Sequence, residues 1–561
     1  MSELYIPPPW LTGAGDRFSL TVSEVSGRNG PWTCPGKVAH KARQKAGSVQ
    51  PNDSSRWVPR WDTSEQLFFA LRDGLGALDG GASLGEAAAI NQNLTIGQRR
   101  FVTHALHELS ELADLVTDSA GVPMRYEGTS TSFFRQGWGQ VSLTGPEYVT
   151  EDGTIRESVR MAHKDPRDPD AAHTQDFAAT AAMVLASDRP ELARLRVSEF
   201  SLASGRYRVL FDGTPAEAQA AYRDRTDLET GHLVAQALGG LVLNPGSACG
   251  GCPFLQVCPG PERLRGALGI PTQAVASRAI TSTDLAIYDD CPSRFHLQRR
   301  SHLPPRPRLD GDGDGGEDMT PRLRGLATHT FLRWAHNRTP HQACTLADLP
   351  DPETEPDAAA VLLAETGIDA IGYAHARPYL LAHLETCLLG FAGLTDIRVE
   401  PRHTVYDADA DVVLVAEPDL TLSSGPGSRI WRETKTRGYL PPEDEYHALS
   451  QYPAFAFHIA LLHAGVDGNS RDSGAGELEV LTPNGSQVFY VPLSDGALVA
   501  HALRVVASIA LRWAQDLTFA PNPSQACTRC PMHGWCDPPE IAALPTTAAD
   551  DREFLGQPDP F

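Results

Sequence analysis

The chain has 561 residues, of which 41% are hydrophobic and 21% charged, and a formal net charge of -22. This composition is typical of a globular protein, and the length predicts two or three domains. The acidic balance argues against a broad basic surface for nucleic acid, so any DNA contact must be a local basic groove or one assisted by bound metal. Neither a signal peptide nor a bilayer-spanning apolar run is evident, which predicts a cytoplasmic protein with no membrane partner.

Ten cysteines are present, and eight of them fall into two sets with matching spacing. In each set a Cys-Pro precedes a Cys-x2-Cys-x5-Cys pattern, by 215 residues in one set and 236 in the other. Four thiolates in a set suit either a tetrahedral Zn²⁺ ion or a 4Fe-4S cluster. We interpret the remaining Cys344 and Cys387 as ordinary buried thiols. The two sets are Cys34, Cys249, Cys252 and Cys258, and Cys291, Cys527, Cys530 and Cys536.

The repeated cysteine spacing predicts two tandem copies of one structural plan. Asn244-Pro245 shortly precedes the first Cys-x2-Cys pattern, and Asn522-Pro523 precedes the second. We expect each copy to be a mixed α/β domain, with a central sheet flanked by helices and closed by a cysteine-cluster lobe. The predicted divisions are a first domain at 1–262, a linker at 263–277, a second domain at 278–540 and a flexible tail at 541–561.

Strand and helix patterns alternate along the first copy. The expected elements are a strand or short helix at 17–25, a basic helix at 37–45, amphipathic helices at 65–78 and 97–115, paired strands within 127–147 and 197–210, and a long helix at 215–238.

The second copy shows similar patterns. Pro453 lies inside one helical segment and predicts a kink or a late helix start there. The expected elements are a helix at 321–337 carrying His329, further helices within 358–389, a helical segment at 445–464 carrying Gln451, paired strands within 478–492 that turn at Asn484-Gly485, and a closing helix at 497–513.

A Glu-x-Lys triplet, Glu433-Thr434-Lys435, is the centre of the candidate site. Residues two apart on a strand share a face, so the carboxylate and the ammonium group lie side by side. A hairpin from strand 412–415 through a Gly/Ser/Pro-rich loop at 420–428 would place Asp419 beside Glu433. Two carboxylates suit Mg²⁺ or Mn²⁺ for phosphodiester hydrolysis, and a lysine can orient water or offset negative charge. Taken alone, the triplet also fits a surface hairpin with an ion pair.

The first copy carries a degenerate version of this pattern. Glu147 and Glu157 align with Asp419 and Glu433, and Gln175 aligns with Gln451. The lysine position holds Val159 instead. Without the lysine the group expected to order the attacking water is missing, so we predict that the first copy is inactive.

Six pieces in order resemble the RecB-type nucleases of the PD-(D/E)XK superfamily, over about residues 278 to 540. The resemblance is to their iron-sulfur branch, which includes CRISPR-associated exonucleases and AddB-type nuclease domains. The pieces are Ile280 to Leu285 with Cys291-Pro292-Ser293-Arg294-Phe295, Gly325 to His329, Ala416 to Asp419, Glu433 to Lys435, Gln451 with Phe455, and Cys527-x2-Cys530-x5-Cys536.

This resemblance implies roles for particular residues. His329, Asp419 and Glu433 would bind metal, Lys435 would be catalytic, and Gln451 would help to position the site or the DNA. The cysteine layout is that of the iron-sulfur nucleases, whereas zinc ribbons usually show two Cys-x2-Cys pairs. We therefore favour a 4Fe-4S cluster at each cysteine set and keep zinc as the alternative.

The expected function is a Mg²⁺- or Mn²⁺-dependent DNA exonuclease that cuts through its C-terminal copy. The N-terminal copy would bind DNA, as single strands or ends, or a partner. No GxxxxGK[ST] loop is present, so a motor would be a separate helicase or defence protein. The alternative is a catalytically silent iron-sulfur subunit that binds DNA ends or serves as a scaffold in a repair or defence complex. A third reading is a paired zinc-binding structural protein.

Overall fold

The computed structural model divides into two compact units, which we describe separately. Unit 1 comprises Met1–Gly260, His296–Pro307 and Pro531–Asp537, and unit 2 comprises Pro261–Phe295, Arg308–Cys530 and Pro538–Phe561. The residues that the structure describes are 18–26, 34, 36–37, 63–90, 94–136, 139–166, 168–227, 230–231, 233–234, 243–252, 255–256, 258–271, 273–274, 277–305, 320–391, 393–438, 442–524, 526–527 and 530–536.

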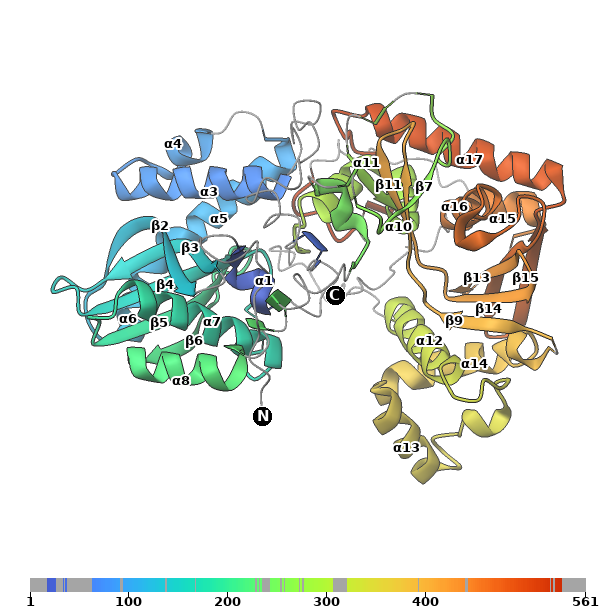
Figure 1. Cartoon of the computed structure of the whole chain (residues 1–561), viewed down its shortest axis with the longest axis horizontal. Coiled ribbons are helices and arrows are strands. Elements are labelled where there is room, and N and C mark those ends of the chain that lie inside the picture. The colour runs from blue at the N-terminus through green and yellow to red at the C-terminus, as the bar shows by residue number, and fades with distance from the viewer. Residues whose placement is uncertain are drawn as a thin grey trace, which may run out of the picture. The chain divides into compact units, whose positions relative to one another are not determined.

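A six-stranded mixed sheet forms the centre of unit 1 (Figure 1). The strand order is β1-β3-β4-β5-β6, and β2 also pairs with β3. Two of the pairs, β1 with β3 and β4 with β5, are parallel, and the others are antiparallel. The strands are β1 (Phe18–Thr21), β2 (Arg125–Gln136), β3 (Gly139–Val149), β4 (Ile155–Ala162), β5 (Arg194–Ser201) and β6 (Tyr207–Gly213).

Helices cover both faces of this sheet. On one face α7 buries Phe177 in a core shared with Leu195 and Val197 of β5. On the other face Arg196 of β5 donates a hydrogen bond to Ser119 of α6 at 2.6 Å. The helices of unit 1 are α1 (Val22–Ser26), α3 (Thr63–Asp79), α4 (Leu84–Ala89), α5 (Ile96–Ser110), α6 (Leu112–Ala120), α7 (Ala172–Asp188), α8 (Pro215–Arg225), the 3₁₀ turn η1 (Ser247–Gly251) and the single-turn η2 (His296–Arg300).

Unit 2 contains two sheets. A four-stranded sheet has the order β7-β10-β11-β8, and a five-stranded sheet has the order β15-β14-β13-β12-β9. In the larger sheet β13 and β14 are parallel and the remaining pairs are antiparallel. The strands are β7 (Glu262–Leu264), β8 (Ala279–Thr281), β9 (Thr395–Val399), β10 (His403–Asp407), β11 (Val412–Ala416), β12 (Leu420–Gly425), β13 (Ser428–Thr436), β14 (Ala475–Thr482) and β15 (Gly485–Pro492).

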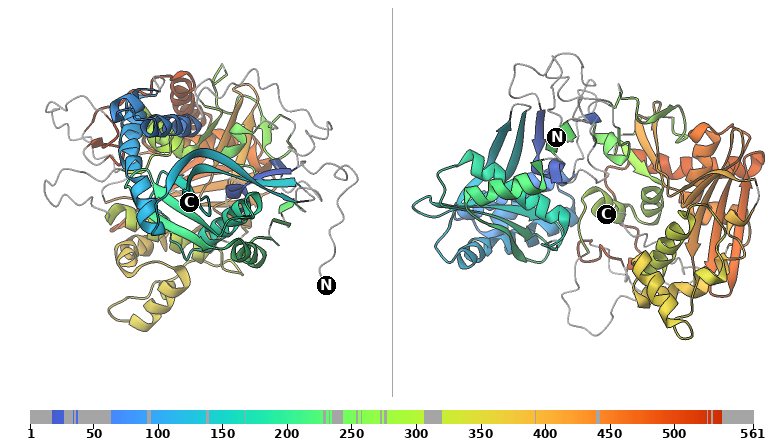
Figure 2. Two further views of the ribbon diagram at one scale, coloured as in Figure 1. Left: turned by 90° about the vertical axis from the view of Figure 1, so that its left-hand side faces the viewer. Right: turned by 60° about the horizontal axis from the view of Figure 1, so that its bottom comes forward.

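The five-stranded sheet lies between two groups of helices. The group α15, α16 and α17 covers one face, and α12 and α14 cover the other (Figure 2). The helices of unit 2 are α10 (Ser282–Asp290), α11 (Pro292–Phe295), α12 (Thr320–His336), α13 (Pro356–Thr366), α14 (Ala370–His383), α15 (Glu445–Gln451), α16 (Pro453–His463), α17 (Gly496–Gln515) and the 3₁₀ turns η3 (Leu346–Asp348), η4 (Leu388–Gly390) and η5 (Val466–Gly468).

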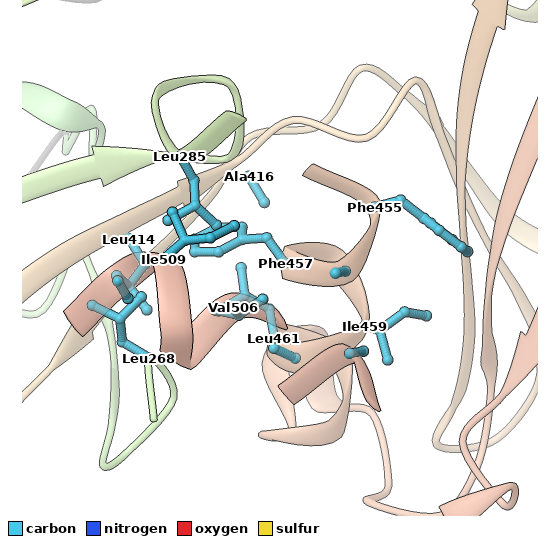
Figure 3. Close-up of a cluster of buried hydrophobic side chains, with 14 of the residues drawn as sticks. Leu268, Leu285, Leu414, Ala416, Phe455, Phe457, Ile459, Leu461, Val506 and Ile509 are labelled. Carbon is cyan, nitrogen blue, oxygen red and sulfur yellow. The ribbon is translucent and has the colours of Figure 1, made fainter. Parts of the chain in front are cut away.

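One hydrophobic core joins the two sheets of unit 2 through α16 and α17. Leu414 of β11, Phe457 of α16 and Ile509 of α17 are buried in it (Figure 3). By length and composition α17 is apolar enough to cross a membrane. Its apolar face is packed into this core, however, with Val506 and Trp513 buried, so packing inside the unit accounts for its composition.

Most of the expected elements are present, but several boundaries differ. Segment 17–25 is both a strand and a helix, β1 and α1, and the helix expected at 97–115 is broken at Glu111 into α5 and α6. The helix expected at 215–238 is interrupted at Thr226, because α8 ends at Arg225 and the described residues between 227 and 234 are helical again. A new helix does begin at Pro453, which occupies the first turn where a missing N–H costs nothing. The basic helix expected at 37–45 lies almost wholly outside the described residues.

The hairpin expected around the Glu-x-Lys triplet was placed wrongly. Segment 420–428 contains a strand, β12, which forms the hairpin with β13. β11 instead pairs with β10 and β8 in the other sheet. Leu420, Thr421 and Leu422 are all buried in this strand. The Gly and Ser residues that follow them obscured it in the sequence.

The predicted linker is structured. Leu264 pairs with Asp407 in the four-stranded sheet, and Leu268 and Ile270 are buried in the core of unit 2. The unit division also differs from the predicted domain limits, because two short segments of the second predicted domain belong to unit 1. In one of them Trp535 is fully buried, contacts Phe101 of α5 edge to face, and donates a hydrogen bond to the carbonyl of Pro304 at 2.7 Å.

Candidate active site

Strand β13 presents Glu433 and Lys435 on one face, as predicted. Both side chains are buried, and the ammonium group of Lys435 donates a hydrogen bond to a carboxylate oxygen of Glu433. Trp431, two residues earlier on the same face, is 1% exposed and belongs to the hydrophobic core. The parallel neighbour β14 pairs along β13 from Ile430 to Thr436. The triplet therefore sits on a strand that is fixed along its length, and the surface-hairpin reading is wrong.

Asp419 lies beside this pair because of the β12–β13 register. Leu420 pairs with Arg432, so the preceding residue, Asp419, is brought next to Glu433. The backbone N–H of Thr434 donates a hydrogen bond to an oxygen of Asp419 at 2.7 Å. The Asp419 side chain is thus held by the strand that carries the other two site residues.

His329 reaches the same place from helix α12. Its Nδ1 lies 2.9 Å from Oδ1 of Asp419. Arg324, one turn earlier on α12, donates a hydrogen bond to the hydroxyl of Thr436 on β13 at 3.3 Å. Four of the predicted residues, His329, Asp419, Glu433 and Lys435, therefore converge.

The charges in this cluster stabilise one another. Burial alone would lower the pKa of His329, but the adjacent Asp419 outweighs it and raises that pKa. Burial would raise the pKa of Asp419, yet His329 and Lys435 hold it below its usual value. Burial likewise disfavours the charged form of Lys435, whereas Glu433 and Asp419 raise its pKa. The cluster is a compact set of acidic and basic groups in mostly buried surroundings.

Gln451 is not joined to this cluster. It is the last residue of α15, and its side chain is exposed. The hydrogen bonds that the structure shows around Asp419 and Glu433 do not include it. Its positioning role stays a prediction.

Sequence analysis missed two residues of the site. Glu400 follows β9, its backbone N–H donates to the carbonyl of Asp419 at 3.0 Å, and burial raises the pKa of its carboxyl group. His458 of α16 is buried with its Nδ1 3.6 Å from Glu433, and burial lowers its pKa. Neither stands in a motif, so only the packing of β9 and α16 reveals them. A small pocket beside the site is lined by His329, Leu332, Arg333, His336, Glu400, Asp419, Leu420, Arg432 and Thr434.

The corresponding residues of unit 1 do not form such a site. Glu147 pairs with Ser158 across the β3–β4 hairpin, so Glu147 and Glu157 point to opposite faces of the sheet. Glu147 accepts a hydrogen bond from Arg156, while Glu157 is fully buried and lies 3.2 Å from Arg196. The predicted alignment with Asp419 and Glu433 therefore fails as a paired-carboxylate geometry, because the register differs by one residue.

The cysteine sets are placed as follows. In unit 1, burial raises the pKa of Cys249 to about 11, and the nearby thiols of Cys252, Cys34 and Cys258 contribute to that rise. The first set is therefore gathered around Cys249. Of the second set, Cys291, Cys527 and Cys530 belong to unit 2 and Cys536 belongs to unit 1. All eight cysteines are partly buried.

Unit 2 thus combines mixed α/β sheets with a cluster of two carboxylates, a histidine and a lysine, a donor set that suits a divalent metal ion. Comparison with protein families identifies the class of domain. Residues 279–537 match the family described as the PD-(D/E)XK nuclease superfamily, and this part of the chain is a domain of that superfamily.

Other comparisons add little. No curated protein matches the chain. One similar solved structure, titled "Crystal structure of SSO0001", has 14% sequence identity and a TM-score of 0.22, and the match covers 46% of this chain and 85% of that one. At that score the likeness carries no argument about fold or function.

Proposed function

We propose that this protein is a metal-dependent DNA nuclease whose C-terminal domain hydrolyses phosphodiester bonds. The observation that carries the proposal is the convergence of His329, Asp419, Glu433 and Lys435 within a domain that matches a nuclease superfamily. A nuclease domain implies a nucleic acid substrate. We favour DNA, presented as single strands or ends, and exonucleolytic cutting.

The donor set suits a hard divalent cation. Carboxylate oxygens of Asp419 and Glu433 are the ligands that Mg²⁺ and Mn²⁺ prefer, and Nδ1 of His329 adds a nitrogen donor accepted by Mn²⁺. These three residues would hold the ion. When bound, it would polarise a phosphoryl oxygen and acidify water.

The remaining groups have roles that follow from their contacts. Lys435 is held by Glu433, so its ammonium group is placed to orient water or to offset negative charge on the phosphate. Glu400 adds a third carboxyl group on the pocket side of Asp419. His458 contributes a buried imidazole whose Nδ1 lies 3.6 Å from Glu433.

We propose that unit 1 is a second, inactive copy of the same plan, used to bind DNA or a partner. In both units an antiparallel hairpin is followed by a helix and a parallel strand, as in β3-β4-α7-β5 and β12-β13-α16-β14. Thr21 and Glu24 also form the same capping box as Thr281 and Asp284. Arginines pair with both candidate carboxylates, Arg156 with Glu147 and Arg196 with Glu157, which supports loss of catalysis.

We propose a 4Fe-4S cluster at each cysteine set. The gathering of the first set around Cys249 supports a shared centre there. Among the described residues, one group of candidate metal ligands has all its ligand atoms within 4.8 Å of one another. That group lies outside both cysteine sets.

A catalytically silent iron-sulfur subunit is the second candidate, and the net charge of -22 favours it. In that role the chain would bind DNA ends or a partner such as a helicase in a repair or defence complex. The intact carboxylate and lysine cluster opposes it, because holding four ionisable groups in mostly buried surroundings is costly unless they serve a function.

A cleavage assay separates the two. Anaerobically purified wild type and Lys435→Ala would be given end-labelled single- and double-stranded DNA with Mg²⁺, Mn²⁺ or EDTA. We expect metal-dependent cutting that falls by at least about 100-fold in the variant, while DNA binding measured by fluorescence anisotropy is retained. Wild type that binds DNA with full clusters but does not cut with either metal would favour the silent subunit.

A further inference from the structure

Four buried metal-ligand side chains meet at the ends of α12 and α14, outside the proposed nuclease site. They are His336, Cys344, His383 and Cys387, and each is at most 5% exposed. Their candidate ligand atoms all lie within 4.8 Å of one another. We propose that this Cys2His2 group binds one structural zinc ion, in addition to the metals considered above.

The spacing of the atoms fits a tetrahedral ion. Nε2 of His336 lies 3.8 Å from Sγ of Cys387. Zinc–sulfur bonds of about 2.3 Å and zinc–nitrogen bonds of about 2.05 Å place tetrahedral ligands roughly 3.4 to 3.8 Å apart. Two thiolates and two imidazoles make a closed site with no open position, which is the pattern of structural zinc.

The surroundings orient one histidine for this role. Nδ1 of His383 lies 2.9 and 3.0 Å from the two carboxylate oxygens of Glu479, which is itself 0% exposed. Nε2 of His383 is buried and has no hydrogen-bond partner. A carboxylate that fixes one ring nitrogen while the other faces the metal is the usual outer contact of a zinc-bound histidine. Without a metal, that buried nitrogen would remain unsatisfied.

A zinc ion at this place would tie a small helical lobe together. Phe331 and Leu332 of α12, Leu362 of α13 and Leu380 of α14 share one hydrophobic cluster with the two cysteines. The cluster is small for three helices, so a metal that joins the ends of α12 and α14 would supply binding energy to the fold. The site also lies seven residues along α12 from His329.

Glu479 links this group to the nuclease strand, a consequence that rests on the proposed function. The carboxylate that contacts His383 also accepts a hydrogen bond from the hydroxyl of Thr434 at 3.0 Å. The backbone N–H of Thr434 is the group that holds Asp419. Zinc would therefore act as a positioning element for the catalytic residues without contacting substrate.

The proposal is tested by measuring the zinc content of the full chain in the absence of DNA. Anaerobically purified protein would be analysed by inductively coupled plasma mass spectrometry as wild type, Cys387→Ser, His336→Cys and Cys249→Ser. We expect Cys387→Ser to lose one zinc ion per chain, His336→Cys to keep it, and Cys249→Ser, which alters a different site, to keep it too. Glu479→Gln should weaken zinc affinity by about 10- to 100-fold.

A measurement on wild type alone covers the case in which a variant fails to fold. Zinc-edge X-ray absorption of the wild-type chain is expected to show two sulfur and two nitrogen neighbours around the bound zinc ion. A wild-type chain with no zinc, zinc bound by sulfur alone, or a Cys344–Cys387 disulfide found by mass spectrometry would overturn the proposal. Lys435→Ala tests the nuclease proposal separately. We expect this variant to lose cleavage and to keep its zinc, so that the cleavage result bears on the nuclease site and the zinc content bears on the Cys2His2 site.

Discussion

Asp419 holds the candidate site together, because it contacts His329 and the backbone of β13 at once. We expect Asp419→Asn to keep the shape of the site but to remove a charge that a divalent ion needs. Cleavage should fall by about 100-fold or more, and Mn²⁺ affinity measured by calorimetry should fall with it. Glu417→Gln is the matched control, since Glu417 lies two residues earlier and pairs with Arg402 outside the site. Equal losses in both variants would contradict this role for Asp419.

Glu157 tests whether unit 1 is inactive, because a substitution there should change stability and leave cleavage unchanged. Its buried carboxyl group accepts hydrogen bonds from Ser198 and Tyr207 and lies beside Arg196. We expect Glu157→Ala to destabilise unit 1 by roughly 3 kcal/mol, because it leaves a buried arginine short of a partner, and to leave cleavage unchanged.

Urea unfolding and the cleavage assay would be compared with Glu151→Ala, an exposed residue of the neighbouring turn. Cleavage that survives Lys435→Ala but is lost in Glu157→Ala would mean that unit 1 is active.

Among single residues, those of the Glu-x-Lys triplet could be predicted from the sequence, whereas the residues that surround them from other elements could not. Glu433 and Lys435 share a face because side chains alternate along any strand, so their spacing was sufficient. Asp419 was predicted beside Glu433 from a hairpin whose strands were placed wrongly, and His329 was identified through the family resemblance. Glu400 and His458 come from other elements and stand in no pattern, and Cys344 and Cys387 seemed ordinary until the fold brought two histidines to them.

Among the elements, helix α10 begins directly after strand β8 and ends next to Cys291, the first cysteine of the second set. Thr281 caps α10, accepting the backbone N–H of Asp284 at 2.9 Å, while the Asp284 carboxylate accepts the N–H of Thr281. We expect Thr281→Ala to destabilise unit 2 by about 1 kcal/mol, measured by urea unfolding. Thr281→Ser keeps the oxygen and should restore most of the loss. If serine restored nothing, lost packing of the methyl group would be responsible.

Most helices and hairpins were predictable because their apolar periodicity is local. The β12 strand was missed because its Gly and Ser neighbours resemble a loop, and its strand character comes from pairing with β9 and β13. The break at Glu111 was likewise invisible, since apolar residues continue through it into α6.

For the whole molecule, the cluster proposed at the second cysteine set would join residues that are far apart in sequence. A centre that ties Cys291 to Cys530 closes a loop of more than 200 residues, so its loss should release much chain entropy in the unfolded state. We expect Cys530→Ala to lower the thermal unfolding temperature of the second domain, measured by calorimetry beside iron and sulfide content. Cys344→Ala, which alters no residue of this set, is the control for cluster content. A folded Cys530→Ala protein with full cluster content would contradict this role.

The mixed α/β class could be anticipated from the strand and helix patterns, but not the way that the chain divides. The tandem plan that the cysteine repeat predicts stays a proposal. Contiguous domains are the simplest assumption for a repeat, and the predicted limits followed it. The two compact units instead interleave, with 296–307 and 531–537 contributing to the first. Only long-range contacts, such as that of Trp535 with Phe101, reveal this.

That interleaving bears on how the protein is made. During synthesis, N-terminal domains usually fold before the rest of the chain has left the ribosome. Unit 1 cannot complete its packing in this way, because Trp535 fills its interior and is translated near the end. The first unit would wait, partly assembled, for almost the entire polypeptide. A shortened gene product ending before Trp535 would therefore harm the N-terminal half as well as the C-terminal one.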